Sequence, residues 1–224
     1  MTDRLTGAVP ILCLVSDRRR AAAQGSWSET VRAFSTLAAK AGEAEISLFQ
    51  VREPDLETAQ LVDLVTASVE AARGSSMKVV VNDRLDAALA TGAAGVHLRG
   101  DSIAPRAARS IAPPEFLIGR SVHHATEAGA HASAVDYLIA GTVFPSGSKP
   151  ADHPLLGGGG LKTIVDAVHV PVLAIGGVTL DRVPEIAAAG AAGVAAIGLF
   201  ASAQSLIEIA HAIRSAFDRV RTAS

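Results

Sequence analysis

The chain has 224 residues, of which 49% are hydrophobic and 19% charged, and its formal net charge is −2. This composition suits a large buried core and argues against disorder. The near-neutral charge, without a basic block, argues against a nucleic-acid partner, and no apolar run is long enough to span a bilayer. The single cysteine, Cys13, cannot form an internal disulfide, which fits a reducing compartment. We expect a cytoplasmic protein with a small-molecule ligand.

Short β-rich runs alternate with longer amphipathic segments along the whole chain. The runs are nearly continuous in apolar residues, as expected for parallel strands buried on both faces. The expected strands are 11–16, 45–52, 78–82, 94–98, 116–122, 137–144, 171–177 and 193–199. A helical pattern follows each strand; in one of them Thr179 is the expected N-cap and Gly190 the expected stop. Eight such units predict an α/β fold, a single (β/α)8 TIM barrel.

The domain organisation is expected to be simple, because no linker or shift in composition divides the chain. Residues 1–10 are expected to form a flexible N-terminal extension, and residues 11–224 the barrel. The Pro- and Gly-rich segment 145–160 is expected to be a long loop after the sixth strand. Such loops are lids or disordered segments. A homo-oligomer is compatible with the sequence, which does not fix the oligomeric state.

Polar residues gather at the ends of the predicted strands, where barrel enzymes place their chemistry. The candidates for substrate binding are Gln50, Arg52, Asn82, Ser146, Ser148 and Lys149. Arg52 and Lys149 can pair with a carboxylate or phosphate, although Arg52 could instead form a structural salt bridge with Glu53. Asp83 could hold a divalent cation together with Asn82, but capping the following helix is its favoured role.

The last two strands end in glycines instead of polar side chains. Loops after strands 7 and 8 commonly form a phosphate site in this fold, because glycine lets the phosphate oxygens reach backbone N–H groups. The expected phosphate-binding residues are Gly176, Gly177, Ile197 and Gly198, followed by a helix that begins near Ser202.

The fifth strand ends in the sequence RSVHH, which is unusually polar for a buried strand. Alternation along the strand places Ser121 and His123 on one face, with Arg120 on the other. A histidine titrates near neutrality and can act as acid or base. We therefore predict His123 as the proton-transfer residue and Ser121 as its catalytic neighbour, while His124 opens the next helix.

Seven segments in order resemble the thiamin-phosphate synthase/TenI superfamily of β/α barrels, from about residue 11 to residue 201. They are LCLVSD, FQVRE, VVVNDRLDAALATGAAGVHL, IGRSVHHATEA, YLIAGTVFPSGSKP, PVLAIGGVT and AAGVAAIGLFAS. The resemblance implies a thiazole phosphate substrate. Synthases of this superfamily join a pyrimidine methyl diphosphate to a thiazole phosphate with the help of Mg²⁺. The TenI branch aromatises a carboxythiazole phosphate by moving a proton.

The chain departs from the synthase pattern at two places. Pro54 stands where synthases usually carry the lysine of Gln-x-Arg-x-Lys, and Ser102 stands where a metal-binding carboxylate is usual; Asp101, one residue away, could replace it. The segment IGRSVH resembles the TenI branch, in which a histidine matching His123 is the acid/base. On the sequence alone we favour a thiazole tautomerase without a cofactor.

Two alternatives stay open. The chain keeps Gln50, Asn82, Asp83 and the segment SGSK, as a thiamin-phosphate synthase would. In that case we expect Mg²⁺ at Asp83 and Asp101. The second alternative is a regulator on the same barrel that binds a phosphorylated ligand without catalysis.

Overall fold

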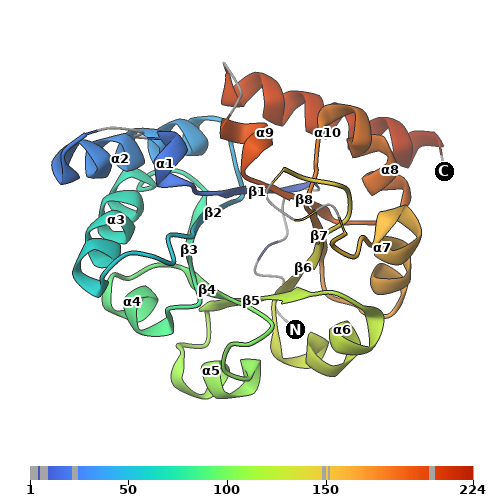
Figure 1. Cartoon of the computed structure of the whole chain (residues 1–224), viewed down its shortest axis with the longest axis horizontal. Helices are drawn as coiled ribbons and strands as arrows, with labels where there is room; N and C mark the ends of the chain where they lie inside the picture. The colour runs from blue at the N-terminus through green and yellow to red at the C-terminus, as the bar shows by residue number, and fades with distance from the viewer. Residues whose placement is uncertain are drawn as a thin grey trace.

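The computed structural model describes Leu5 and residues 10–21, 25–147, 150, 152–201 and 205–223. Its strands are all parallel and close into a barrel in chain order, with helices around the outside (Figure 1). The strands are β1 Ile11–Val15, β2 Leu48–Val51, β3 Lys78–Asn82, β4 Gly95–Leu98, β5 Leu117–Val122, β6 Tyr137–Gly141, β7 Val172–Ile175 and β8 Gly193–Ala196. The predicted TIM barrel is confirmed.

The helices follow the strands in the expected alternation. They are α1 Arg18–Ala21, α2 Trp27–Glu43, α3 Thr58–Ala71, α4 Leu85–Ala90, α5 Pro105–Ile111, α6 Ala125–His131, α7 Gly157–Asp166, α8 Val183–Ala188, α9 Gly198–Ala201 and α10 Leu206–Ala223, with 3-10 turns η1 Ala132–Ala134 and η2 Leu180–Arg182. Within the described ranges no helix is both long and apolar enough to cross a membrane.

The buried side chains form two layers, one inside the barrel and one between the strands and the helices. The inner layer consists of Ile11, Cys13, Val15, Leu48, Val80, Leu117, Tyr137, Ile139, Leu173 and Ala195. Along β5, Leu117 belongs to this inner layer and Ile118 to the outer one. Because side chains alternate along a strand, Ser121 faces the interior and Arg120 the helices, which agrees with the prediction that the two lie on opposite faces.

Several predicted boundaries need correction. The helix expected near Ser202 begins at Gly198, directly after β8, and the expected loop 145–160 ends earlier because α7 begins at Gly157. Gly190 has φ 81° just after α8, as a helix stop requires, but Thr179 makes no side-chain capping hydrogen bond. Positions 1–4 and 6–9 of the expected extension lie outside the described residues, so its flexibility stays a prediction.

Candidate active site

Two amide side chains meet at the ends of β2 and β3. Gln50 is 3% exposed, and its Nε2 donates to Oδ1 of Asn82 at 2.9 Å. The thiol of Cys13 lies below them, 3.9 Å from Oε1 of Gln50. Burial raises the pKa of Cys13 to about 12, so the thiol stays protonated. The amide side chains of Gln50 and Asn82 therefore place uncharged hydrogen-bond donors and acceptors at the ends of β2 and β3.

Ser121 hydrogen-bonds to a histidine that the sequence analysis did not single out as a site residue. Nε2 of His97, at the end of β4, lies 2.9 Å from the Ser121 hydroxyl. His97 is 2% exposed, and its ring packs at 5.6 Å, centroid to centroid, on Tyr137. Desolvation, with the positive charges of Arg52 and Arg120, lowers the pKa of His97 to about 3. His97 is therefore neutral at physiological pH and holds Ser121 in place.

The adjacent histidines at the end of β5 have different partners. Nδ1 of His123 lies 2.6 Å from the carbonyl oxygen of Gly141, at the end of β6. A carbonyl only accepts, so Nδ1 of His123 carries a proton, and in the tautomer with this single ring proton Nε2 keeps a lone pair. His124 instead caps α6, accepting from the backbone N–H of Glu127 at 3.2 Å. Only His123 is thus set up as a base, on an exposed side chain.

Asp83 does not cap α4, contrary to the sequence-based preference. The N-cap residue is Arg84, and it makes no side-chain capping bond. One Asp83 carboxylate oxygen accepts a hydrogen bond from the Ser102 hydroxyl, and the other lies 3.5 Å from Nε of Arg99. The Arg99 guanidinium also holds Asp101 through two hydrogen bonds, of 2.9 and 2.6 Å.

This corner does not fit a divalent cation. Mg²⁺ needs several oxygen ligands at about 2.1 Å, yet Asp83 and Asp101 both contact Arg99. In the described part of the chain, no three His, Cys, Asp or Glu side chains gather as metal ligands.

Arg52 does not pair with Glu53, contrary to the structural role considered from the sequence. Glu53 is 7% exposed and accepts from the Ser16 hydroxyl at 2.7 Å and from Nη1 of Arg18 at 3.1 Å. Arg52 is exposed and has no ion pair with a described residue. Arg52 is therefore available to an anionic ligand, while the buried Glu53 joins the ends of β1 and β2.

The glycines after β7 have the backbone geometry that only glycine adopts easily. Gly176 and Gly177 have φ of 97° and 61°, and a Cβ at Gly177 would lie 2.3 Å from the carbonyl oxygen of Pro145. A Cβ at Gly198, the first residue of α9, would meet open space. Gly177 follows β7 and Gly198 follows β8, and these two strands are paired, so the two glycines can contribute to one phosphate site. Ile197 lies between β8 and Gly198.

Three predicted site residues belong to the loop after β6. Ser146 is half-buried in that loop, whereas Ser148 and Lys149 lie outside the described residues, so their binding roles stay predictions. The other predicted substrate-binding and catalytic residues lie at one end of the barrel, because the parallel strands all have their carboxyl ends there. These residues are Gln50, Arg52, Asn82, Ser121 and His123.

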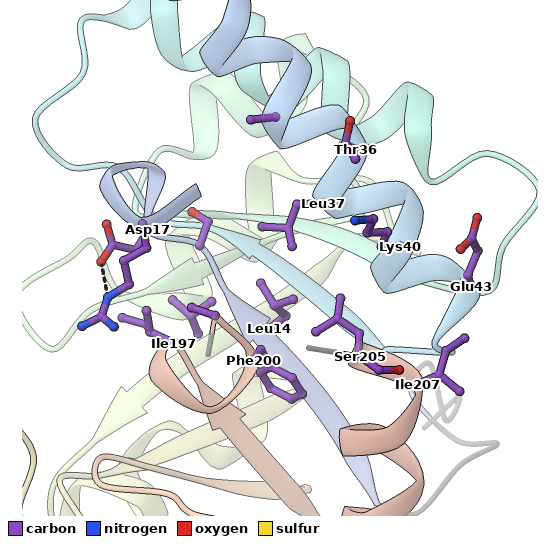
Figure 2. Close-up of a pocket in the computed structure, with 16 residues that line it drawn as sticks. Leu14, Asp17, Thr36, Leu37, Lys40, Glu43, Ile197, Phe200, Ser205 and Ile207 are labelled. Carbon is purple, nitrogen blue, oxygen red and sulfur yellow. Dashed lines mark hydrogen bonds and ion pairs between the residues drawn. The ribbon is translucent and has the colours of Figure 1, made fainter. Parts of the chain in front are cut away.

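A cavity of about 530 Å³ lies beside β1, between α2 and the α9–α10 region (Figure 2). Leu14, Leu37 and Phe200 give it an apolar wall outside the barrel. Ser16 and Ile197, at the ends of β1 and β8, also line it. We place the site at the strand ends, because an anionic ligand needs the donors gathered there.

A family model and two similar sequences agree on one family. A family model described as thiamine monophosphate synthase matches residues 13–200. The chain is 37% identical to the thiamine-phosphate synthase of Methanoculleus marisnigri, over 86% of this chain and 90% of that protein. It is 41% identical to that of Methanoregula boonei, over 67% and 69% of the two chains. The structure of thiamine phosphate pyrophosphorylase from Pyrococcus furiosus superposes with TM-score 0.79 at 29% identity, over 97% and 98% of the chains.

Proposed function

Because the chain belongs to the thiamine monophosphate synthase family, we propose that this enzyme of thiamine biosynthesis is a thiamine-phosphate synthase. The observation that carries the proposal is the 37% identity to a named synthase over 90% of that protein's length. Sequence motifs alone favoured the tautomerase, and the named relatives reverse that order.

The proposed reaction joins a pyrimidine methyl diphosphate to a thiazole phosphate. The bond from the methylene carbon to the diphosphate oxygen breaks, a bond from that carbon to the thiazole forms, and diphosphate leaves with the electron pair. The backbone N–H groups of Gly177, Ile197 and Gly198 would hold the thiazole phosphate. The amide pair of Gln50 and Asn82 would hydrogen-bond a heterocycle, since each amide both donates and accepts.

Charge and hydrogen bonding would then assist departure of the diphosphate. Arg52, exposed and without an ion pair to a described residue, can neutralise an oxyanion. Ser121 offers a hydroxyl held by neutral His97 at 2.9 Å. Ser146, Ser148 and Lys149 are the predicted further contacts to the diphosphate.

A direct assay tests the proposal with the full-length protein. Aromatic thiazole phosphate and pyrimidine methyl diphosphate are supplied, with Mg²⁺ in one arm and EDTA in another, and products are followed by mass spectrometry. We expect thiamin phosphate and diphosphate to appear in equal amounts. Thiazole phosphate binding without product in both arms would instead support the regulator.

Thiazole tautomerisation is the second candidate, and the geometry of His123 favours it. With Nδ1 bound to the Gly141 carbonyl at 2.6 Å, Nε2 is free to take a proton from one substrate carbon and return it to another. Aromatisation of the ring would drive this transfer. Incubation with the carboxythiazole phosphate alone tests it. His123→Ala should slow aromatisation by about 10²- to 10⁴-fold, whereas an unchanged rate would remove His123 from the reaction.

A further inference from the structure

We propose that the guanidinium of Arg99 supplies, at the ends of β3 and β4, the positive charge that a divalent cation would otherwise bring to the leaving diphosphate. The inference rests on the proposed function and deepens it. It predicts that this chain binds diphosphate at this corner without a metal ion.

Two carboxylates hold the guanidinium of Arg99 in position. Asp101 holds Nε and Nη2 of Arg99 at 2.9 and 2.6 Å, and this two-point contact fixes the plane of the group. Asp83 lies 3.5 Å from the same Nε. The guanidinium therefore lies between the two carboxylates that this corner offers, where a bound cation would also have to lie.

The charges at this corner disfavour a divalent cation. Ser102, a neutral residue, occupies one oxygen of Asp83 with its hydroxyl. Arg120, 5% exposed, donates from Nη2 to the Gly100 carbonyl at 2.8 Å. The hydrogen bond from Arg99, with a smaller contribution from the charge of Arg120, lowers the pKa of Asp101. The two guanidinium groups thus lie beside the two aspartates, and their positive charge weakens the attraction of Asp83 and Asp101 for a divalent ion.

The guanidinium of Arg99 keeps N–H donors that contact neither aspartate. A guanidinium has five N–H groups, and the contacts to Asp101 and Asp83 involve only Nε and Nη2. Nη1 of Arg99 has no hydrogen bond to a described residue, and the side chain is 45% exposed. Planar N–H pairs of this kind bind phosphate oxygens at two points. Arg99 is thus oriented by its carboxylates and still able to bind an anion.

Metal binding tests the proposal independently of turnover. EDTA-treated full-length protein is titrated with Mn²⁺ and followed by electron paramagnetic resonance. We expect no bound Mn²⁺ in the parent at millimolar concentration. In the double variant Arg99→Gln/Ser102→Asp, which removes the cation and adds a carboxylate, we expect a bound Mn²⁺. A Mn²⁺ site in the parent that Asp83→Asn abolishes would overturn the proposal.

Inorganic diphosphate supplies the second measurement, by calorimetry in EDTA. We expect the parent to bind it and Arg99→Gln to bind it about tenfold or more weakly. Arg84→Gln is the matched control, because Arg84 holds Asp86 by the same two-point contact, at 2.8 and 2.6 Å, and should leave the affinity unchanged. Thermal unfolding checks that the variants are folded.

The outcomes separate this inference from the proposed function. If the parent binds diphosphate only when metal is added, or not at all, the role of Arg99 is wrong even when synthase turnover is found. If neither reaction is catalysed but metal-free diphosphate binding still depends on Arg99, the charge assignment stands and the synthase proposal fails.

Discussion

Nε2 of His97 and the hydroxyl of Ser121 lie 2.9 Å apart across neighbouring strands at the barrel mouth. The other ring nitrogen of His97, Nδ1, is buried and has no hydrogen-bond partner in the described part of the chain. Because a buried N–H without an acceptor is rare in proteins, we infer that the proton is on Nε2. His97 then donates to Ser121, and the serine proton is free for a ligand.

Stability should therefore depend on pH through His97. The unfolded histidine titrates near 6.5, but burial lowers the folded pKa to about 3. Below pH 6.5 the unfolded state binds more protons, so the free energy of unfolding should fall as pH drops from about 6.5 towards 3, by up to about 1.4 kcal/mol per pH unit. Urea unfolding between pH 4 and 7.5 measures this. His97→Gln should show a shallower slope, and an equal slope would contradict the assignment.

Ser121→Ala should affect both stability and ligand binding. Nε2 of buried His97 loses its partner, which should cost about 1–3 kcal/mol of unfolding free energy. The diphosphate also loses the hydroxyl donor proposed for it, so we expect weaker binding of inorganic diphosphate. Urea unfolding and calorimetry measure the two effects. Ser110→Ala is the control, because its hydroxyl bonds a helix carbonyl on the exposed face of α5.

The fold follows from periodicity, and so could be predicted from the sequence. Apolar runs alternating with amphipathic helices specify the barrel, and alternation along β5 places Ser121 on the face opposite Arg120 without knowledge of its partner. The contact with His97 depends on register: His97 pairs with Gly119, so Ser121 lies one interior position further along β5. Strand stagger in the closed barrel creates that neighbour, and no spacing within the sequence encodes it.

The contacts of Asp83 come from a different loop, so the local sequence does not predict them. Its position before a helical pattern predicted that Asp83 caps α4. Instead, Asp83 has φ 65°, and its carboxylate contacts Arg99 and Ser102, which belong to the loop after β4. A similar reason applies to Arg52, which sequence proximity paired with Glu53. In the structure Glu53 pairs with Arg18 instead, which lies in the segment after β1.

Gly177→Ala should damage the turn after β7. A Cβ there meets the Pro145 carbonyl at 2.3 Å, on a backbone with φ 61°, so we expect a loss of about 1–3 kcal/mol in unfolding free energy. Displacement of the turn should also weaken binding of thiazole phosphate. Gly159→Ala is the control, because its Cβ meets open space in α7, and it should be neutral or slightly stabilising. Equal behaviour of the two variants would argue against the turn geometry.

Arg18→Gln should destabilise the protein more at pH 7.5 than at pH 4. Arg18 is the ion-pair partner of buried Glu53, whose pKa is raised by desolvation despite its hydrogen bonds to Ser16 and Arg18. A protonated Glu53 needs no counter-ion, whereas the ionised form does, so the loss of Arg18 matters most where the carboxylate is charged. We expect a cost of about 1–3 kcal/mol at pH 7.5 by urea unfolding, which shrinks as the carboxyl protonates.

A double-mutant cycle with Glu53, and a control at the exposed ion pair of Arg20 with Asp17, isolate the contribution of the Arg18–Glu53 pair. In a background of Glu53→Gln, Arg18→Gln should lose the part of its pH-dependent cost that comes from Glu53 and keep only the part that comes from Asp55, which Arg18 also holds at 2.5 Å. Arg20→Gln breaks the exposed pair with Asp17 and should change stability by no more than about 0.5 kcal/mol at either pH. If Arg18→Gln behaves like Arg20→Gln, the pair with Glu53 does not stabilise the ends of β1 and β2. The buried carboxylate would then be held by the Ser16 hydroxyl and the Arg18 backbone N–H alone, which donate at 2.7 and 3.0 Å.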